Sequence, residues 1–309
     1  MKGLPLQVGY FYNNKAKKQL LELVNRSTPD RIYCQLLRTA EYGKMFNIRK
    51  MIDYQDVFSQ GMLRRAEKSN FLFKKIFMTE YYRLQRYERN LFSWFDHKII
   101  ISKYDRDYIA HPQKEEITII PNGVDHDFFR PQLSEKKYDL VFTGNMNYPP
   151  NISAAEYIVY QILPIVQKVL PNTTALISGV TPHARVRALQ GHNVTVTGWV
   201  EDIRTSYSSA KIFIAPMLIG TGLQNKLLEA MAMKLPCISS KLANKSLCAK
   251  PNDEIITCQT PQEYADAVVY LLQNQEDADK LADNGHRFVK QQYNWELTVE
   301  TMEQVMGIL

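Results

Sequence analysis

The chain has 309 residues, of which 45% are hydrophobic and 23% are charged, and its formal net charge is +6. This length and composition can bury one large core or two medium ones, and two domains are the better expectation. The charge is too small to indicate a dedicated nucleic-acid binder, but it is compatible with anionic substrates or an anionic membrane surface.

Nothing in the sequence indicates a membrane span or a secreted protein. No run of about 18 uncharged apolar residues occurs, and the N-terminus lacks the continuous apolar core of a signal peptide. The four cysteines show no C-x-x-C pairing, which favours reduced, buried thiols. We therefore expect a cytoplasmic protein.

The first 122 residues have the pattern of an α/β layer. A helical stretch at 15–24 precedes four apolar runs, at 31–37, 49–54, 97–102 and 116–121. Runs of this kind, separated by helical or loop sequence, predict strands.

A long stretch between Met62 and Trp94 is basic and aromatic. Its pattern predicts a helix that can lie on an anionic membrane, with Arg and Lys near lipid phosphates and Phe and Tyr at the interface. The alternative is a structural role for the same residues.

From 123 to 292, strand and helix patterns alternate regularly. Strands rich in valine and isoleucine that alternate with amphipathic helices predict a parallel, doubly wound sheet. Ligands bind such sheets beyond the carboxyl ends of the strands. The loops that follow the strands contain glycines, at Gly144, Gly179, Gly198, and Gly220 with Gly222.

The segment 211–240 reads as a strand, a glycine loop, a helix and a second strand. Asn225, Lys226 and Glu229 are spaced three and four apart, so they share one face of this helix. The N–H groups of a helix start and a flexible glycine loop suit a phosphate, and a carboxylate two turns on, at Glu229, suits two sugar hydroxyls. The alternative is an ordinary crossover helix whose polar residues are capped or solvated.

This segment resembles the donor-nucleotide segment of retaining glycosyltransferases of the family 4 type. The residues 222–232, GLQNKLLEAMA, are most similar to a bacterial subgroup associated with exopolysaccharide loci. The resemblance implies two Rossmann-like domains that face each other across a cleft and clamp a sugar nucleotide. It also implies that Glu229 binds the ribose.

The sequence departs from the family pattern at two positions of this segment. The family's other glutamate, which faces the donor sugar, falls on Thr221, and Lys234 replaces a glycine that is usually left-handed. A non-glycine residue there costs on the order of 1 kcal/mol.

Other motifs extend the resemblance over roughly 200 residues. The loop 143–151 resembles one that faces the diphosphate, and 198–202 resembles one whose backbone pairs with the base. Lys226 is the only obvious cation for the diphosphate, and Arg204 or a preceding segment is a candidate second one. We expect catalytic roles for Lys226, Glu229 and Thr221, and donor-binding roles for Gly144, Asn145, Met146, Gly198, Trp199, Val200, Gly220, Gly222, Leu223 and Asn225.

The resemblance also extends to the N-terminal part of the chain. Asp53 and Asp56 match a segment near the acceptor site, where loop capping is the alternative role. Residues 80–88 match a pattern of the subgroup, which favours a structural role there. The family's domain begins with further elements, so we expect a truncated first domain at 1–122, with 293–309 crossing back onto it, and a donor domain at 123–292.

Two D-x-D triplets, at 105–107 and 125–127, spell the metal signature of another glycosyltransferase fold. The first opens a helix, where aspartate is common, and the second lies in the expected interdomain connection. We predict no metal site and no cofactor, with the nucleoside diphosphate sugar as a substrate.

The sequence thus predicts a metal-independent retaining glycosyltransferase that acts on a glycan or lipid-linked acceptor, with no nucleic acid as partner. The protein would be cytoplasmic and peripheral to the inner face of the membrane. Two alternatives stay open, namely an inactive homologue that binds nucleotide or a partner transferase, and a sugar-nucleotide epimerase of the same fold.

Overall fold

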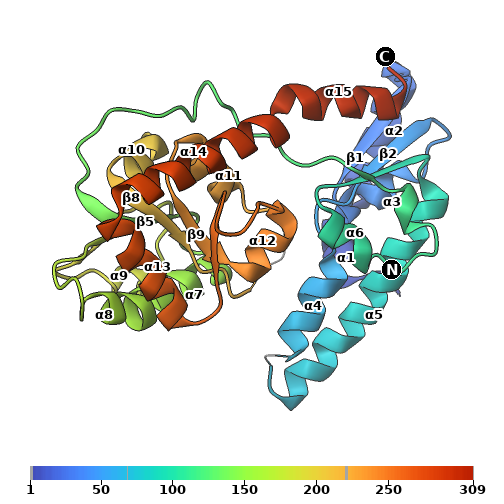
Figure 1. Ribbon diagram of the computed structural model, residues 1–309. Helices are drawn as coiled ribbons and strands as arrows, with labels where there is room; N and C mark the ends of the chain where they lie inside the picture. The colour runs from blue at the N-terminus through green and yellow to red at the C-terminus, as the bar shows by residue number, and fades with distance from the viewer. Residues whose placement is uncertain (1–2, 68, 220–221, 309) are drawn as a thin grey trace. The chain divides into compact units, whose positions relative to one another are not determined.

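A computed structural model describes residues 3–67, 69–219 and 222–308 and divides the chain into two compact units (Figure 1). Unit 1 comprises Met1–Pro121 and Thr298–Leu309, and unit 2 comprises Asn122–Leu297. The described residues of both units form α/β structure with parallel sheets, as the sequence predicts.

Unit 1 contains a four-stranded parallel sheet in the order β1-β2-β3-β4. All four strands coincide with the apolar runs of the sequence, and Met51, Ile52, Ile99 and Ile100 are buried within them. The strands are β1 (Arg31–Gln35), β2 (Arg49–Asp53), β3 (His97–Ile100) and β4 (Thr118–Ile119). The helices are α1 (Leu6–Phe11), α2 (Asn14–Ser27), η1 (Leu37–Thr39), α3 (Ala40–Gly43), α4 (Phe58–Glu67), α5 (Phe71–Trp94), α6 (Lys103–Tyr108) and η2 (Lys114–Glu116).

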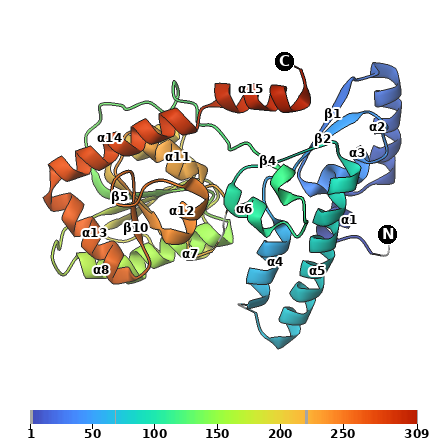
Figure 2. The same ribbon diagram turned by 45° about the vertical axis from the view of Figure 1, so that its right-hand side comes forward.

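The predicted single helix at 62–94 is wrong, because two helices occupy this stretch. Helix α4 ends at Glu67 and α5 begins at Phe71, and the Asn70 side chain caps α5 by accepting from the Phe73 amide at 3.2 Å. The two helices lie side by side as a hairpin in both views (Figures 1 and 2).

The end of α15 (Trp295–Met306) belongs to unit 1. Met302, Val305 and Met306 pack against a small core cluster on the sheet. Arg31 Nε donates to the Met306 carbonyl at 2.7 Å, which fixes the end of the helix next to β1.

Unit 2 contains a six-stranded parallel sheet in the order β10-β9-β8-β5-β6-β7, with helices on both faces (Figures 1 and 2). The strands are β5 (Tyr138–Thr143), β6 (Ala175–Ser178), β7 (Val194–Val196), β8 (Ala210–Ala215), β9 (Cys237–Ser240) and β10 (Ile256–Cys258). The helices are α7 (Pro149–Tyr157), η3 (Ile158–Ile162), α8 (Leu163–Val166), α9 (Ala184–Arg187), α10 (Ile203–Ser208), α11 (Asn225–Ala232), α12 (Lys241–Leu247), α13 (Pro261–Gln273) and α14 (Gln275–Gln292).

The order of this sheet reverses between β5 and β8. The chain moves outward from β5 to β6 and β7, and then returns to place β8 on the other side of β5, where Val141 pairs with Leu176 and Phe213. Such a reversal sends the loops after the two strands in opposite directions and opens a crevice between them. A ligand site of unit 2 is therefore expected after Thr143 and Ala215.

Most cysteines are buried, and all four are free thiols. Cys34, Cys237 and Cys258 are buried as expected, whereas Cys248 is exposed at the end of α12. Lys234, which follows α11, has a φ of 59° and so adopts the left-handed conformation that the sequence comparison implied.

Candidate functional site

A cavity of about 560 Å³ lies in unit 2 at the reversal of the sheet. It collects residues from the loop after β5, the loop after β7 and the start of α11. Its walls are formed by Phe128, Thr143, Gly144, Asn145, Asn151, Gly179, Val180, Trp199, Val200, Glu201, Ile203, Leu223, Gln224, Asn225, Lys226 and Glu229.

The first turn of α11 opens into this cavity. Gln224 is the N-cap residue, and its side chain donates to the Gly222 carbonyl at 2.8 Å instead of capping the helix. Amides of a first helical turn have no partner within the helix, and together they favour a negative charge. This helix start can therefore receive an anion.

Lys226 lies one residue into α11, with its ammonium group against β5 and α7. Its Nζ donates to Asn151 Oδ1 at 2.5 Å and sits 4.5 Å from the centre of the Phe142 ring. Burial lowers the pKa of Lys226 to about 7, although the nearby Glu229 carboxylate opposes the shift. A bound anion would restore the charge of this amine.

Two glycines bring the loops after β5 and β6 into contact at the cavity. A Cβ at Gly179 would lie 1.8 Å from the carbonyl oxygen of Gly144, and one at Gly144 would lie 3.0 Å from Lys226 Nζ. Both glycines have φ near +150°, a conformation that other residues rarely adopt. Only glycine at both positions leaves room for the lysine and for a ligand.

Glu229 is held by a tyrosine that the sequence comparison did not identify. Tyr207 Oη donates to Glu229 Oε2 at 2.6 Å, and Thr143 Oγ1 lies 2.8 Å from the same phenol oxygen. Because the phenol has one proton, the threonine hydroxyl donates to it. Burial raises the pKa of Glu229, whereas the bond from Tyr207 and the charge of Lys226 lower it.

The other predicted donor residues divide into several groups. Asn145, Trp199, Val200, Leu223 and Asn225 line the cavity together with Gly144, Lys226 and Glu229. Met146 is fully buried in the core, and Gly198 and Gly222 are not part of the cavity wall. Gly220 and Thr221 lie outside the described residues.

Arg204, the candidate second cation, has other partners. Its guanidinium forms a bidentate pair with Asp202, donates to the Phe128 carbonyl at 3.1 Å and lies 4.0 Å from the centre of the Phe128 ring. Arg204 is therefore not available to the diphosphate in this arrangement, and it instead fixes Phe128 at the cavity wall.

Asp53 and Asp56 lie in unit 1, after strand β2. Asp53 is buried and accepts from Tyr33 Oη at 2.6 Å and from the Gln55 amide at 3.0 Å, whereas Asp56 is exposed. The contacts of Asp53 are those of a residue that shapes its loop, and Asp56 remains accessible to a ligand.

The motif at residues 80–88 is buried against its own unit. Glu80 accepts from the Leu6 amide, Tyr87 donates to Glu41 at 3.0 Å, and Glu88 accepts from the Ser59 amide at 2.9 Å. Burial raises the pKa of Glu88 to about 7. These contacts favour the structural interpretation of the motif.

Both D-x-D triplets have local partners. Asp105 accepts from Ser102 at the start of α6, and Asp125 Oδ1 accepts from the amides of Asp127 and Phe128 at 3.1 and 2.9 Å. Within the described residues, no group of three His, Cys, Asp or Glu side chains could hold a metal ion. In the same residues, no helix has the length and hydropathy of a transmembrane span.

The part of the chain that forms this cavity is similar to glycosyltransferases. Residues 137–274, which include β5 through α13, match the model of the family Glycosyl transferases group 1. A 44.6 kDa protein of unknown function from the cps region of Klebsiella pneumoniae is 21% identical over 95% of this chain and 77% of that protein.

Solved structures confirm the fold class over nearly the whole chain. Sucrose-phosphate synthase from Thermosynechococcus elongatus has a TM-score of 0.71 at 18% identity, covering 94% of this chain and 76% of that one. HepE of Anabaena, in complex with UDP and glucose, has a TM-score of 0.72 at 13% identity, covering 94% and 82%. The chain thus has the α/β fold of these two proteins.

Proposed function

We propose that the protein is a metal-independent, retaining glycosyltransferase. It would move a sugar from a nucleoside diphosphate donor to a glycan or lipid-linked acceptor, in polysaccharide or cell-envelope glycan synthesis. The observation that carries the proposal is the placement of Lys226 and Glu229 on one helix, beside two glycine loops, at the reversal of a parallel sheet.

Each part of the donor has a partner of suitable chemistry in the cavity. The diphosphate lies at the start of α11 and against Lys226, because this position combines free amides with a cation. The ribose lies on Glu229, whose carboxylate can accept from Tyr207 and still accept from hydroxyls. The base lies toward Trp199 and Val200.

The proposed chemistry is mostly positioning and stabilisation of the leaving diphosphate. Charge builds on the diphosphate as the bond to the sugar breaks, and preoriented amides and Lys226 stabilise that charge more than they stabilise the bound donor. Retention follows from the family resemblance, and Asp56 is the residue we propose for orienting an acceptor hydroxyl. The relative from a cps region supports a polysaccharide acceptor.

Calorimetric titration with UDP, GDP and ADP, followed by a donor-hydrolysis assay with the sugar nucleotides of the best binder, tests this proposal. We expect one diphosphate to bind and its sugar donor to turn over equally in EDTA. Binding without turnover would instead support an inactive homologue. Turnover that EDTA abolishes and manganese restores would contradict metal independence.

A further inference from the structure

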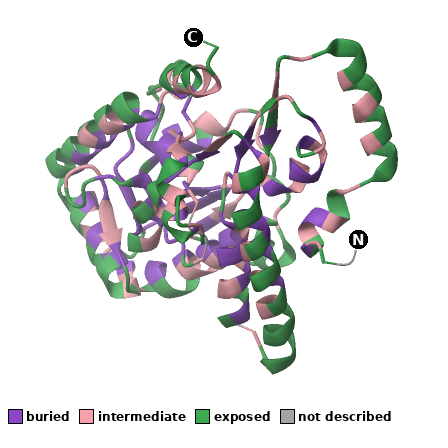
Figure 3. Cartoon of the chain, turned by 90° about the vertical axis from the view of Figure 1, so that its right-hand side faces the viewer, coloured by how far each residue is buried: buried purple, intermediate pink, exposed green. Residues whose placement is uncertain are grey.

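The tip of the α4–α5 hairpin exposes a group of large apolar side chains. Phe71 and Leu72 are 84% and 75% exposed, and Phe73 and Ile76 are 55% and 54% exposed. They occupy the first two turns of α5, and this end of the hairpin is coloured as exposed in Figure 3. Four such side chains at one end of one helix differ from the scattered apolar residues of an ordinary surface.

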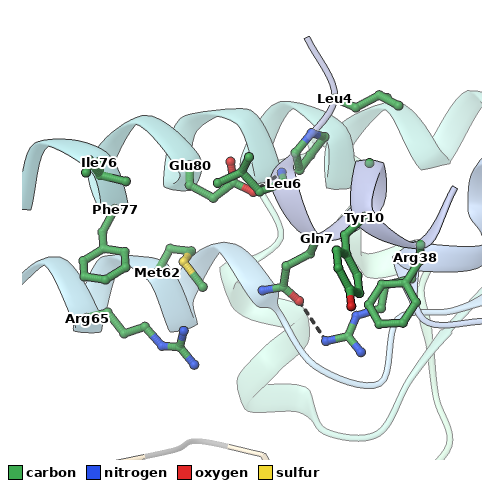
Figure 4. A pocket seen from close by; sticks show the side chains of 13 residues that line it. Leu4, Leu6, Gln7, Tyr10, Arg38, Met62, Arg65, Ile76, Phe77 and Glu80 are labelled. Atoms are coloured by element: carbon green, nitrogen blue, oxygen red, sulfur yellow. Dashed lines mark hydrogen bonds between the residues drawn. The ribbon is translucent and has the colours of Figure 1, made fainter. Parts of the chain in front are cut away.

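The apolar surface continues from the tip along α5 toward α1. A groove of about 850 Å³ runs beside Ile76, Phe77 and Met62 and reaches Leu6 and Tyr10 (Figure 4). The polar side chains in its wall are Arg65 beside Phe77, Glu80 between Ile76 and Leu6, and Arg38, which donates to Gln7 at 2.8 Å. A monomer rarely keeps an apolar surface of this length exposed to water.

The charge around the tip is almost entirely positive. Residues 58–94 contain eight Lys and Arg against three Glu. Two of the three, Glu80 and Glu88, are buried in unit 1, so they contribute little to the outer surface. Lys74 and Lys75 directly follow the apolar tip and are exposed, as is Arg65 on the neighbouring helix.

We propose that unit 1 docks on an anionic lipid bilayer through the tip of the α4–α5 hairpin. Phe71, Leu72 and Phe73 enter the boundary between headgroups and acyl chains, and Lys74 and Lys75 contact the lipid phosphates. Aromatic side chains beside cations are the composition that favours this interface. A second copy of the chain is a poorer occupant, because it would bring two cationic tips together.

The proposal is tested by flotation of the full chain with vesicles of phosphatidylcholine alone and with about 30% phosphatidylglycerol. We expect flotation only with the anionic vesicles, weakened between 0.1 and 0.5 M salt as the Debye length falls from about 10 Å. The triple variant Phe71→Ser, Leu72→Ser, Phe73→Ser should partition at least about tenfold more weakly. The variant Lys74→Glu, Lys75→Glu should show a loss of similar size.

Matched control variants make the same chemical changes elsewhere. Leu133, Tyr160 and Val169 are also large, exposed apolar residues of unit 2, and their triple replacement by serine should leave flotation unchanged. Lys15→Glu with Lys18→Glu, on the exposed face of α2, is the charge control. Titration of every variant with UDP, or with whichever diphosphate the protein binds, reports folding of unit 2, so failure here is distinguishable from failure of the proposed enzyme function.

A second measurement does not depend on removing the tip. The parent chain has three tryptophans, so the fluorescence of a Phe73→Trp variant is compared with that of the parent. The added emission should shift to the blue with anionic vesicles and be quenched by brominated lipids. Equal flotation of tip and control variants would overturn the proposal, as would no flotation of the parent chain or no quenching. A tip variant that turns a dimer into a monomer by sedimentation, with flotation unchanged, would assign the tip to a second copy.

Discussion

Helix α11 in unit 2 and the first turns of α5 in unit 1 depart from the usual burial pattern in opposite directions. Helix α11 holds a lysine and a glutamate in a partly closed cavity, and burial moves both of their pKa values toward the neutral forms. The start of α5 presents phenylalanine and leucine to water. Burying a charge costs free energy, and so does exposing a large apolar side chain.

The two departures differ in what compensates them inside the molecule. Lys226 and Glu229 each have a partner of their own, Asn151 and Tyr207, so their cost is reduced but not removed. Phe71 and Leu72, in contrast, are packed against few residues of the protein, since most of their surface is exposed. In our proposals a ligand completes the first site, whereas a surface large enough to cover a whole helix end completes the second.

The largest effect we expect is on the free energy of unfolding, when one leucine in each of the two helices is replaced by alanine. Leu228 of α11 is fully buried, so Leu228→Ala should cost about 2 to 5 kcal/mol in the free energy of unfolding. Leu72→Ala, at 75% exposure, should change it by less than about 0.5 kcal/mol. Urea unfolding of both variants measures the difference, and a large loss in the Leu72 variant would show that the tip is packed in the protein.

The next effect concerns the affinity of the cavity. Glu229→Ala should weaken binding of the nucleoside diphosphate by about 2 to 3 kcal/mol, because it removes a charge-assisted acceptor of the ribose hydroxyls. Glu276→Ala removes an exposed carboxylate on α14, outside the cavity wall, and should leave affinity unchanged. Calorimetry reports both, and equal affinity in the two variants would rule out the ribose assignment.

The pH dependence of binding tests the lysine. The pKa of Lys226 is about 7 in the empty cavity, so its amine is mostly neutral at pH 8 and must take up a proton to meet a diphosphate. Affinity should therefore fall between pH 7 and 9, by up to about tenfold per pH unit. Calorimetry at pH 8 in buffers of different ionisation enthalpy should show close to one proton taken up.

Lys226→Met is the control for this experiment. It should bind more weakly and lose both the pH dependence and the proton uptake. The folded-state pKa of Lys226 is lowered from 10.5, so its penalty to stability is complete below pH 7 and disappears as pH rises toward 10.5. The variant should accordingly melt at a higher temperature than the parent at pH 7. An affinity that is constant from pH 7 to 9 in the parent chain would contradict a neutral lysine.

Much of the fold could be predicted because its signals are local. Strands β5, β6 and β8 of unit 2 are short runs of mostly buried apolar residues, and the alternation of strands with helices predicts a parallel sheet. The position of Lys226 and Glu229 on one helix face also follows from spacing alone. The break near Phe71 was missed because its only signal is a short capping sequence inside an otherwise helical pattern.

The features of the site that the sequence did not predict are contacts between residues that lie far apart in the sequence. Arg204 looked like a free cation, but it stacks on Phe128, 76 residues earlier in the chain. Tyr207 lies 22 residues before Glu229, on α10, and the two meet because α10 and α11 precede and follow strand β8. No pattern in the sequence around Tyr207 distinguishes it from a core tyrosine.

The smallest effect we expect distinguishes Tyr207 from such a core residue. Tyr207→Phe keeps the ring but removes the hydrogen bond that lowers the pKa of Glu229, so that pKa should rise further. The carboxylate that meets the ribose would then be more readily protonated than in the parent, and affinity should fall by about tenfold, corresponding to one hydrogen bond to a charged group. Because the pKa rises, the loss should be larger at pH 6 than at pH 8.

Tyr264→Phe provides the matched control. Tyr264 is fully buried in unit 2, and its hydroxyl has no hydrogen-bond partner among the described residues, so removing that oxygen should leave affinity unchanged and stability equal or higher. If both variants bind as the parent does at every pH, Glu229 does not depend on Tyr207. If Tyr207→Phe loses affinity equally at pH 6 and pH 8, the tyrosine shapes the cavity without tuning the carboxylate. Only a loss that grows as pH falls agrees with a tyrosine that keeps Glu229 ionised.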